Sequence, residues 1–290
     1  METPFIPFDP DGNDQNTQPR IRDIPIRAIF PNLLTLLAIC SGLTSIRFSI
    51  EGRIELAVAA IILAAILDGL DGRVARFLKS TTRFGAQMDS LADFVNFGVA
   101  PAMMLYFTLM DSVRSFGWIA ALIFAICACL RLARFNVMID MPNQPKWQNN
   151  FFMGVPAPAA ALTVIAPVYA LMLGIERSDG LAVFTTFYTL AIGLLMISSI
   201  PTFSGKEFGK RIARELVLPL MIVLVTAVAF LLTYPWQTLL IFVVIYLAML
   251  PFSIHSWRKQ MHASLQIAHE AAKSSAAKGR KPKSGSASKK

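Results

Sequence analysis

Charged residues are scarce in this chain of 290 residues. Lys, Arg, Asp and Glu together make up 16% of it, whereas a soluble domain carries about 25%. Hydrophobic residues reach 55%, and the mean hydropathy is +0.55. The apolar residues fall in runs of about 18 to 22, the length that crosses the hydrocarbon core of a bilayer. The sequence therefore excludes an ordinary soluble domain and predicts an all-α polytopic membrane protein.

Cysteine and histidine are also rare, with three of each. Cys40, Cys127 and Cys129 fall within apolar runs, where we interpret them as small packing residues. The sequence thus supports neither a disulfide framework nor a cysteine-based metal site. The histidines come at or after the last apolar run. They offer no Ser-His or Cys-His pair, which disfavours catalysis by an activated protein nucleophile.

The apolar runs predict about eight transmembrane helices. They lie near residues 32–50, 54–77, 88–110, 116–138, 156–175, 181–200, 216–234 and 236–255. An even number of spans puts both ends of the chain on one side of the membrane. The loops on that side hold Lys79, Arg83, Lys146, Lys206, Lys210, Arg211 and Arg214. The opposite loops are poor in basic residues, so the positive-inside rule places both termini in the cytoplasm.

Two polar segments flank the spans at 32–255. Residues 1–31 form a cytoplasmic segment, in which isoleucines alternate with arginines after residue 20 and predict a short interfacial helix. Residues 256–290 hold nine Lys and Arg against a single acidic residue, Glu270, and we expect a largely disordered cytoplasmic tail. This tail is either simply solvated or attracted to anionic headgroups. No aromatic residue follows Trp257, which disfavours a nucleic-acid partner.

Four carboxylates lie where a membrane protein accommodates charge least easily. They sit at the predicted cytoplasmic ends of the second and third spans, and a charge near the bilayer centre costs about 2.5–3.5 kcal/mol on insertion scales. At about 100° per residue they fall on two helical stripes. One stripe holds Asp68, Asp71, Gly72, Ala75 and Arg76, and the other holds Gly85, Asp89 and Asp93. The short loop between the spans lets the two stripes face each other.

Oxygen ligands from two helices suit hard divalent cations, Mg²⁺ or Mn²⁺, better than Zn²⁺. Two such ions are the arrangement used for displacement at phosphorus. The alternative is a set of interfacial aspartates that reach into cytoplasmic water. Four aspartates in two matched stripes, with glycines beside them, favour the cation site.

The same residues resemble a family signature. Residues 68–93 match the pattern D-x-x-D-G-x-x-A-R, eight residues, then G-x-x-x-D-x-x-x-D of the CDP-alcohol phosphatidyltransferases. The resemblance implies a core of six transmembrane helices, here extended by two, and a homodimer. It also implies that Asp68, Asp71 and Asp89 are ligands shared by two divalent cations. Asp93 would be a ligand of one cation and the general base.

Further site residues follow from this resemblance. Gly72 and Arg76 look like contacts to the CDP portion of the substrate, together with the motif glycine Gly85. Pro31 and Asn32 resemble the family's nucleotide-contacting segment. Thr82 occupies a position at which members of the family often have a further contact to the substrate.

Three stretches resemble the phosphatidylserine synthase branch of the family, namely residues 93–102, 130–136 and 152–160. That branch transfers the phosphatidyl group of CDP-diacylglycerol to the hydroxyl of L-serine and releases CMP. Arg131 and Arg134 lie three apart on one helical face and could hold the serine carboxylate, with Asn136 as a further contact. They could also be positive-inside anchors or contacts to the substrate phosphate.

Two other functions stay open from the sequence. The acceptor could be glycerol 3-phosphate, inositol phosphate or choline in the same chemistry. A cation- or proton-coupled transporter would also carry intramembrane carboxylates, but would hold them near the midplane on broken or repeated helices. We expect an enzyme of a bacterial-type cytoplasmic membrane, with its active site and both termini facing the cytoplasm and with membrane lipids around it.

Overall fold

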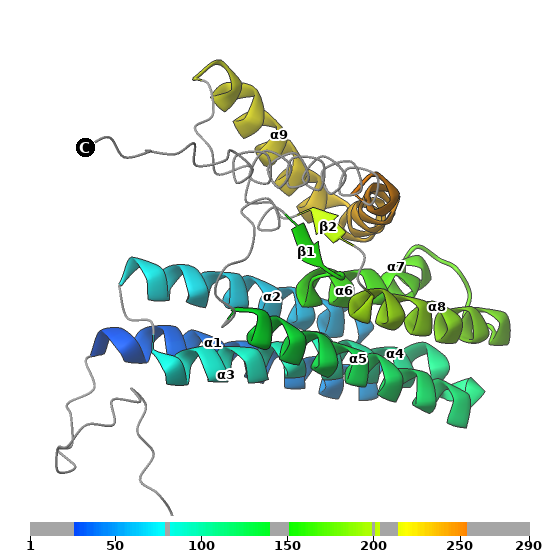
Figure 1. The fold of residues 1–290 in the computed structure, drawn as a ribbon. Coiled ribbons are helices and arrows are strands. Elements are labelled where there is room, and N and C mark those ends of the chain that lie inside the picture. The colour runs from blue at the N-terminus through cyan, green and yellow to red at the C-terminus, as the bar shows by residue number, and fades with distance from the viewer. Residues whose placement is uncertain (1–25, 79–81, 140–150, 199–200, 204–213, 254–290) are drawn as a thin grey trace, which may run out of the picture.

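The computed structural model describes residues 26–78, 82–139, 151–198, 201–203 and 214–253 (Figure 1). The predicted interfacial helix, near residues 20–30, lies outside these ranges up to residue 25, and so does the basic tail. Residues 26–31, assigned from the sequence to the N-terminal segment, are the first turns of a helix that continues into the first predicted span.

Eight helical segments follow one another in the described ranges, and each coincides with one predicted span. The first, second and fourth are α1 (Ile26–Ile50), α2 (Ile54–Phe77) and α5 (Ser115–Ile139). The third joins α3 (Arg83–Asp93), the π-helix η1 (Phe94–Val99), α4 (Ala100–Leu105), the π-helix η2 (Tyr106–Met110) and the 3₁₀ turn η3 (Asp111–Val113). The fifth joins α6 (Ala157–Val164) and α7 (Ala166–Met172). The last three are α8 (Asp179–Ile197), α9 (Arg214–Thr233) and the helix Pro235–Ser253.

Five of the described helices are long and apolar enough to cross a membrane. They are Ile29–Ile50, Phe84–Val113, Ser115–Met138, Asp179–Ile197 and Pro235–Ser253. The helices Ala157–Met172 and Val217–Thr233 are apolar but shorter. The remaining helix, α2, carries the charged residues Glu55, Asp68, Asp71, Arg73 and Arg76. The chain is thus an integral membrane protein with multiple apolar helices.

Prolines account for two irregular places in the helices. Pro101 lies in the first turn of α4 and has no N–H to donate to the preceding turn, and the chain just before it is the π-helix η1. Pro167 lies in the first turn of α7, and the chain leaves helical geometry at Ile165, between α6 and α7. Both irregularities fall within spans that the sequence predicts as continuous.

Two short strands lie outside the all-α prediction. β1 (Phe151–Met153) and β2 (Pro201–Phe203) pair antiparallel, with residue 152 opposite residue 202. Each strand has three residues, too few for an alternating pattern to be visible in the sequence. Figure 1 shows the pair between α6 and α9, where it ties two connections together.

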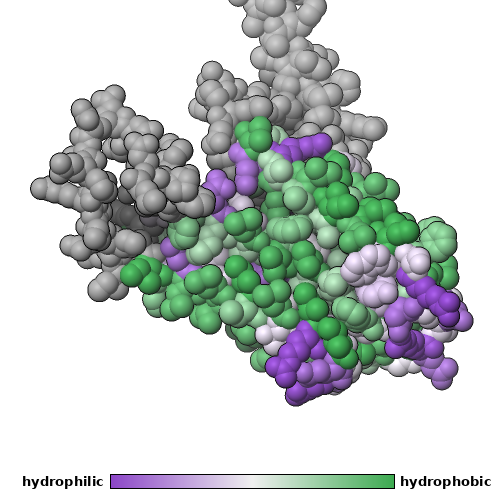
Figure 2. Space-filling model, turned by 90° about the horizontal axis from the view of Figure 1, so that it is seen from below, coloured by the Kyte–Doolittle hydropathy of each residue, from purple (hydrophilic) through white to green (hydrophobic). Residues whose placement is uncertain are grey.

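The core lies among the middle helices. α1 packs along α2, and α5 packs along α8. The largest fully buried side chains include Phe97, Phe124 and Tyr169, from the third, fourth and fifth helical segments. On the face shown in Figure 2 the surface is largely hydrophobic, and hydrophilic residues gather toward the ends of the helices. Such a surface suits lipid chains rather than water.

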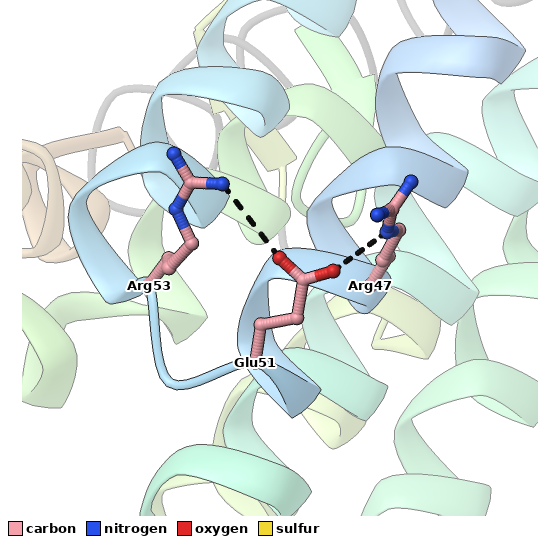
Figure 3. Close-up of polar contacts among 3 residues, drawn as sticks. All are labelled: Arg47, Glu51 and Arg53. Atoms are coloured by element: carbon pink, nitrogen blue, oxygen red, sulfur yellow. Dashed lines mark hydrogen bonds and ion pairs between the residues drawn. The ribbon is translucent and has the colours of Figure 1, made fainter.

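Ion pairs gather at one end of the bundle. Glu51, between α1 and α2, accepts from Arg47 Nε at 2.7 Å and lies 3.7 Å from Arg53 Nη1 (Figure 3). Asp111 pairs with Arg177 in the neighbouring connection. Asp68 and Asp71 lie more than three turns along α2 from Glu51, near the other end of the helix. The two ends of the molecule therefore carry different kinds of charge cluster.

Candidate active site and metal centre

Three aspartates from two helices form an acidic cluster. Asp68 and Asp71 come from the last turns of α2, and Asp89 comes from α3. One carboxylate oxygen of each lies within 4.8 Å of the others. The prediction that the two stripes face each other across the helical hairpin is therefore confirmed for these three residues. Three hard oxygen ligands in so small a space suit a divalent cation.

The hydrogen bonding of Asp71 supports a cation at this place. Its side chain is buried, with 3% of the residue exposed. The hydroxyl of Thr35, on α1, donates to Asp71 Oδ2 at 2.7 Å. The other oxygen, Asp71 Oδ1, is buried and has no hydrogen-bond partner within the part of the chain that the structure describes. A buried carboxylate oxygen is costly without a partner, and a bound cation would provide one.

Asp93 lies beside the cluster rather than within it. It is the last residue of α3, and its carboxyl group lies within hydrogen-bonding reach of that of Asp68. Its Oδ1 is another buried oxygen without a partner among the described residues. Asp93 is thus next to the acidic cluster with an oxygen available to a proton or a cation. Its role as ligand and general base stays a prediction.

The predicted nucleotide contacts of α1 and α3 gather at one point. The hydroxyl of Thr82 accepts from the backbone N–H of Gly85 at 3.0 Å and caps the start of α3. A Cβ atom on Gly85 would lie 3.1 Å from Asn32 Oδ1 and 3.2 Å from Thr82 Oγ1. A side chain at this position would therefore crowd Asn32 and Thr82, where the start of α1 approaches α3. The carbonyl of Pro31, in the same turn of α1, lies 3.1 Å from the Thr35 hydroxyl.

Gly72 and Arg76 line the exposed side of α2 next to the cluster. A Cβ atom on Gly72 would meet nothing within 4 Å, so open space adjoins Asp71 along the helix. Arg76 is exposed one turn further on. This arrangement leaves room for a ligand beside the carboxylates, and the contact of both residues with CDP stays a prediction.

The structure gives the two predicted serine-binding arginines different surroundings. Arg131 interacts electrostatically with Asp93, and its Nε is buried without a hydrogen-bond partner among the described residues. Arg134 Nη1 instead donates to the carbonyl of Ile197 at 3.0 Å, at the end of α8. Asn136 Nδ2 donates to Ser90 Oγ at 3.1 Å, between α5 and α3. Arg131 therefore faces the acidic site, while Arg134 joins two helices.

Sequence reasoning missed two residues of this site. Thr35 lies one turn after Pro31 on α1 and could have been found from that spacing. Tyr246, on the helix Pro235–Ser253, has a buried hydroxyl without a hydrogen-bond partner among the described residues, and it interacts electrostatically with Arg131. A single tyrosine in an apolar helix gives no sequence signal of this kind. The three cysteines are free, as the sequence predicts.

Comparison with known proteins agrees with this geometry. Residues 28–201 match the family described as CDP-alcohol phosphatidyltransferase, and residues 215–251 match CDP-alcohol phosphatidyltransferase 2. The CDP-diacylglycerol–serine O-phosphatidyltransferase of Mycobacterium leprae is 42% identical over 83% of this chain and 80% of its own. The enzyme of that name from Mycobacterium tuberculosis is 39% identical over 79% of each chain. The one from Helicobacter pylori is 33% identical over 76% of this chain and 88% of its own.

Proposed function

This chain belongs to the CDP-alcohol phosphatidyltransferase family, and from that premise we propose that it is a phosphatidylserine synthase. It transfers the phosphatidyl group of CDP-diacylglycerol to the hydroxyl of L-serine and releases CMP. Three relatives named for this reaction match between 76% and 83% of the chain. The observation that carries the proposal is the meeting of Asp68, Asp71 and Asp89 at the end of the α2–α3 hairpin.

The aspartates would hold two divalent cations, Mg²⁺ or Mn²⁺, with Asp93 as a further ligand of one. When bound, these cations neutralise the pyrophosphate charge and the charge that develops on the leaving CMP. The unpartnered oxygens of Asp71 and Asp93 support this assignment. Arg76, exposed beside the cluster, would add a positive charge to the nucleotide end of the substrate.

The transfer is a single in-line displacement. Asp93 accepts the proton of the serine hydroxyl, and the serine oxygen attacks the phosphorus attached to diacylglycerol. The bond between that phosphorus and the CMP oxygen breaks as the new ester bond forms. No covalent phosphatidyl-enzyme intermediate is needed, because the two substrates are held together in one site. The rate of transfer is raised because the two substrates are held in position and because positive charge stabilises the departing CMP.

The nucleotide lies beside the start of α3 in this proposal. Asn32, Thr82 and Gly85 already converge there, and Gly72 leaves open space on the adjoining face of α2. Pro31 starts the same turn of α1 as Asn32. The acyl chains of CDP-diacylglycerol would remain in the lipid around the apolar helices, so the reacting phosphorus lies at the level of the headgroups.

The acceptor would bind on the opposite side of Asp93 from the acidic cluster. Arg131 is the strongest candidate for the serine carboxylate, since it is attracted to Asp93 and has an unused buried N–H. Arg134 and Asn136 stay weaker candidates, because both already have hydrogen-bond partners in the protein.

We place the enzyme in a bacterial-type cytoplasmic membrane as a homodimer with eight spans, with the active site and both termini in the cytoplasm. The basic loops and the basic tail support this orientation. Residues 32–255 would form the catalytic domain, between the cytoplasmic segment 1–31 and the tail 256–290. The substrates are CDP-diacylglycerol and L-serine, and nucleic acid is not a partner.

The identity of the acceptor is the direct test. The purified chain in detergent, with CDP-diacylglycerol and Mg²⁺ or Mn²⁺, would be offered serine, glycerol 3-phosphate, inositol phosphate or choline in separate reactions. Mass spectrometry should identify phosphatidylserine from the serine reaction and no comparable product from the other three. A dominant product with another headgroup would show that serine is not the acceptor. The absence of any lipid product would overturn the proposed function.

A further inference from the structure

Three buried polar atoms near the acceptor side lack hydrogen-bond partners in the described parts of the chain. They are Asp93 Oδ1, Arg131 Nε and the hydroxyl oxygen of Tyr246. They come from three separate elements, α3, α5 and the helix Pro235–Ser253. A buried polar atom without a partner costs stability, so three from converging elements call for a common explanation.

The charges of these groups fit one another. Arg131 interacts electrostatically with Asp93 on one side and with Tyr246 on the other. The guanidinium of Arg131 and the hydroxyl of Tyr246 both donate hydrogen bonds. An acceptor with negative charge would satisfy both donors at once, and neither Arg131 Nε nor the Tyr246 hydroxyl has a partner among the described residues.

Packing explains the ring of Tyr246 but not its hydroxyl. The side chain is partly buried and packs against the hydrophobic core. A phenylalanine would fill the same space without burying an unsatisfied hydroxyl. Tyr188 shows the contrast, since its hydroxyl donates to the carbonyl of Thr163 at 2.9 Å.

We propose that Tyr246 and Arg131 together bind the carboxylate of the amino-acid acceptor, so that the last helix supplies a specificity-determining residue. The inference rests on the proposed function, because it assumes that Asp93 receives the acceptor hydroxyl. In serine, two carbon atoms separate the hydroxyl oxygen from the carboxylate carbon. A serine whose hydroxyl lies at Asp93 can therefore reach a neighbouring pair of donors with its carboxylate.

A substrate phosphate is the other anion that these donors could bind. The acidic cluster and Arg76 already offer a site for the substrate phosphates, which favours the acceptor carboxylate here. The two sources differ in kinetics. Loss of a carboxylate contact raises the KM for serine, whereas loss of a phosphate contact raises the KM for CDP-diacylglycerol.

Tyr246→Phe is the first test, because it removes the hydroxyl and keeps the ring. We expect the apparent KM for serine to rise about tenfold or more, as for loss of a hydrogen bond to a charged group. The KM for CDP-diacylglycerol and the melting temperature in detergent should stay close to wild type. Tyr234→Phe is the matched control, since Tyr234 is exposed and lies just before the start of that helix. It should leave both KM values unchanged.

A double-mutant cycle with Arg131→Lys tests whether both side chains act on one group. If they hold the same carboxylate, the double variant should raise the serine KM by less than the product of the two single effects. An unchanged serine KM in Tyr246→Phe would overturn the inference, as would a rise in the KM for CDP-diacylglycerol of equal size. Wild-type enzyme that fails to use serine would instead refute the proposed function.

Discussion

Thr35 donates its hydrogen bond to Asp71, the buried member of the acidic cluster. The hydroxyl binds one carboxylate oxygen, and the other oxygen has no hydrogen-bond partner among the described residues and is available to the proposed cation. Partners of this kind orient metal ligands, and their loss costs about 10–100-fold in metal affinity. At the scale of single residues, the site thus depends on a residue of α1 that is not itself a ligand.

Thr35→Val should therefore weaken the metal site without removing a ligand. The concentration of Mn²⁺ that gives half-maximal activity should rise about 10–100-fold, and saturating Mn²⁺ should restore much of the rate. Thr44→Val is the matched control, because the Thr44 hydroxyl donates to the carbonyl of Cys40 on the same helix and is exposed. An identical Mn²⁺ dependence in both variants would show that Thr35 has no such role.

Asp93→Asn tests the proposed base. The amide keeps the shape of the side chain but cannot accept the serine proton, so kcat should fall by about 10²–10⁴. Asp111→Asn, at the end of the bundle where Asp111 pairs with Arg177, should leave turnover close to wild type. Full turnover of Asp93→Asn in the presence of Mg²⁺ or Mn²⁺ would rule out the general-base role.

The aspartates could be predicted because their spacing is a property of the sequence alone. Asp68 and Asp71 lie on one stripe of the second helix, and Asp89 lies on a stripe of the third. A short loop between the two helices is enough to bring the stripes together. Thr35 comes from α1, where its spacing from Pro31 was the one available signal, and Tyr246 comes from the helix Pro235–Ser253, far along the chain, where no period connects it to the hairpin. Their contribution depends on how the helices pack, which apolar runs do not specify.

At the scale of elements, Gly154 joins the β1 strand to the helices. Its φ of +80° is left-handed, and a Cβ atom there would lie 2.3 Å from the carbonyl oxygen of Met196 on α8. Both features require glycine. The residue thus holds the connection before α6 directly against the end of α8, close to where Arg134 meets Ile197.

Gly154→Ala should destabilise the fold. Left-handed backbone in a non-glycine residue costs about 1–3 kcal/mol, and the clash with the carbonyl adds to this. The melting temperature in detergent should fall below that of wild type. Gly180→Ala serves as control, because a Cβ atom at that position would meet only Ser178 Oγ, at 3.9 Å. Equal melting temperatures for the two variants would contradict the packing described for Gly154.

Element positions could be predicted more fully than element details. The apolar runs predicted all eight helical segments, because an apolar run is buried away from water and a helix satisfies its backbone hydrogen bonds internally. The π-helix η1 lies next to Pro101, and the break between α6 and α7 lies next to Pro167, so both depend on local backbone conformation. The strands β1 and β2 depend on pairing between distant connections. Neither kind of feature has a period that the sequence displays.

At the scale of the whole molecule, the apolar helices indicate a membrane protein, and the charge distribution predicts its orientation. The basic loops predict that the acidic cluster faces the cytoplasm and that the connection around Asp111 and Arg177 faces outward. The apolar helices alone do not distinguish the two sides of the membrane, because the length of an apolar run is the same from either side. Likewise, no residue pattern predicts an interface for the proposed homodimer, because such an interface depends on how two copies pack.

Cysteine labelling tests the orientation. In a variant without Cys40, Cys127 and Cys129, Ser112→Cys should react with a membrane-impermeant maleimide added to intact bacterial cells. Ala86→Cys should react only after the membrane is opened. Both positions are exposed in the structure, at the two ends of the third helical segment. The reverse labelling pattern would place the acidic cluster outside the cell.

Metal dependence is the sharpest test of the proposed cation site. Purified enzyme would be treated with EDTA, and serine-dependent release of CMP from CDP-diacylglycerol would be measured before and after Mg²⁺ or Mn²⁺ is returned. We predict that activity disappears on chelation and returns with either cation, because Asp68, Asp71 and Asp89 converge to bind them. Undiminished CMP release after thorough chelation would contradict the account.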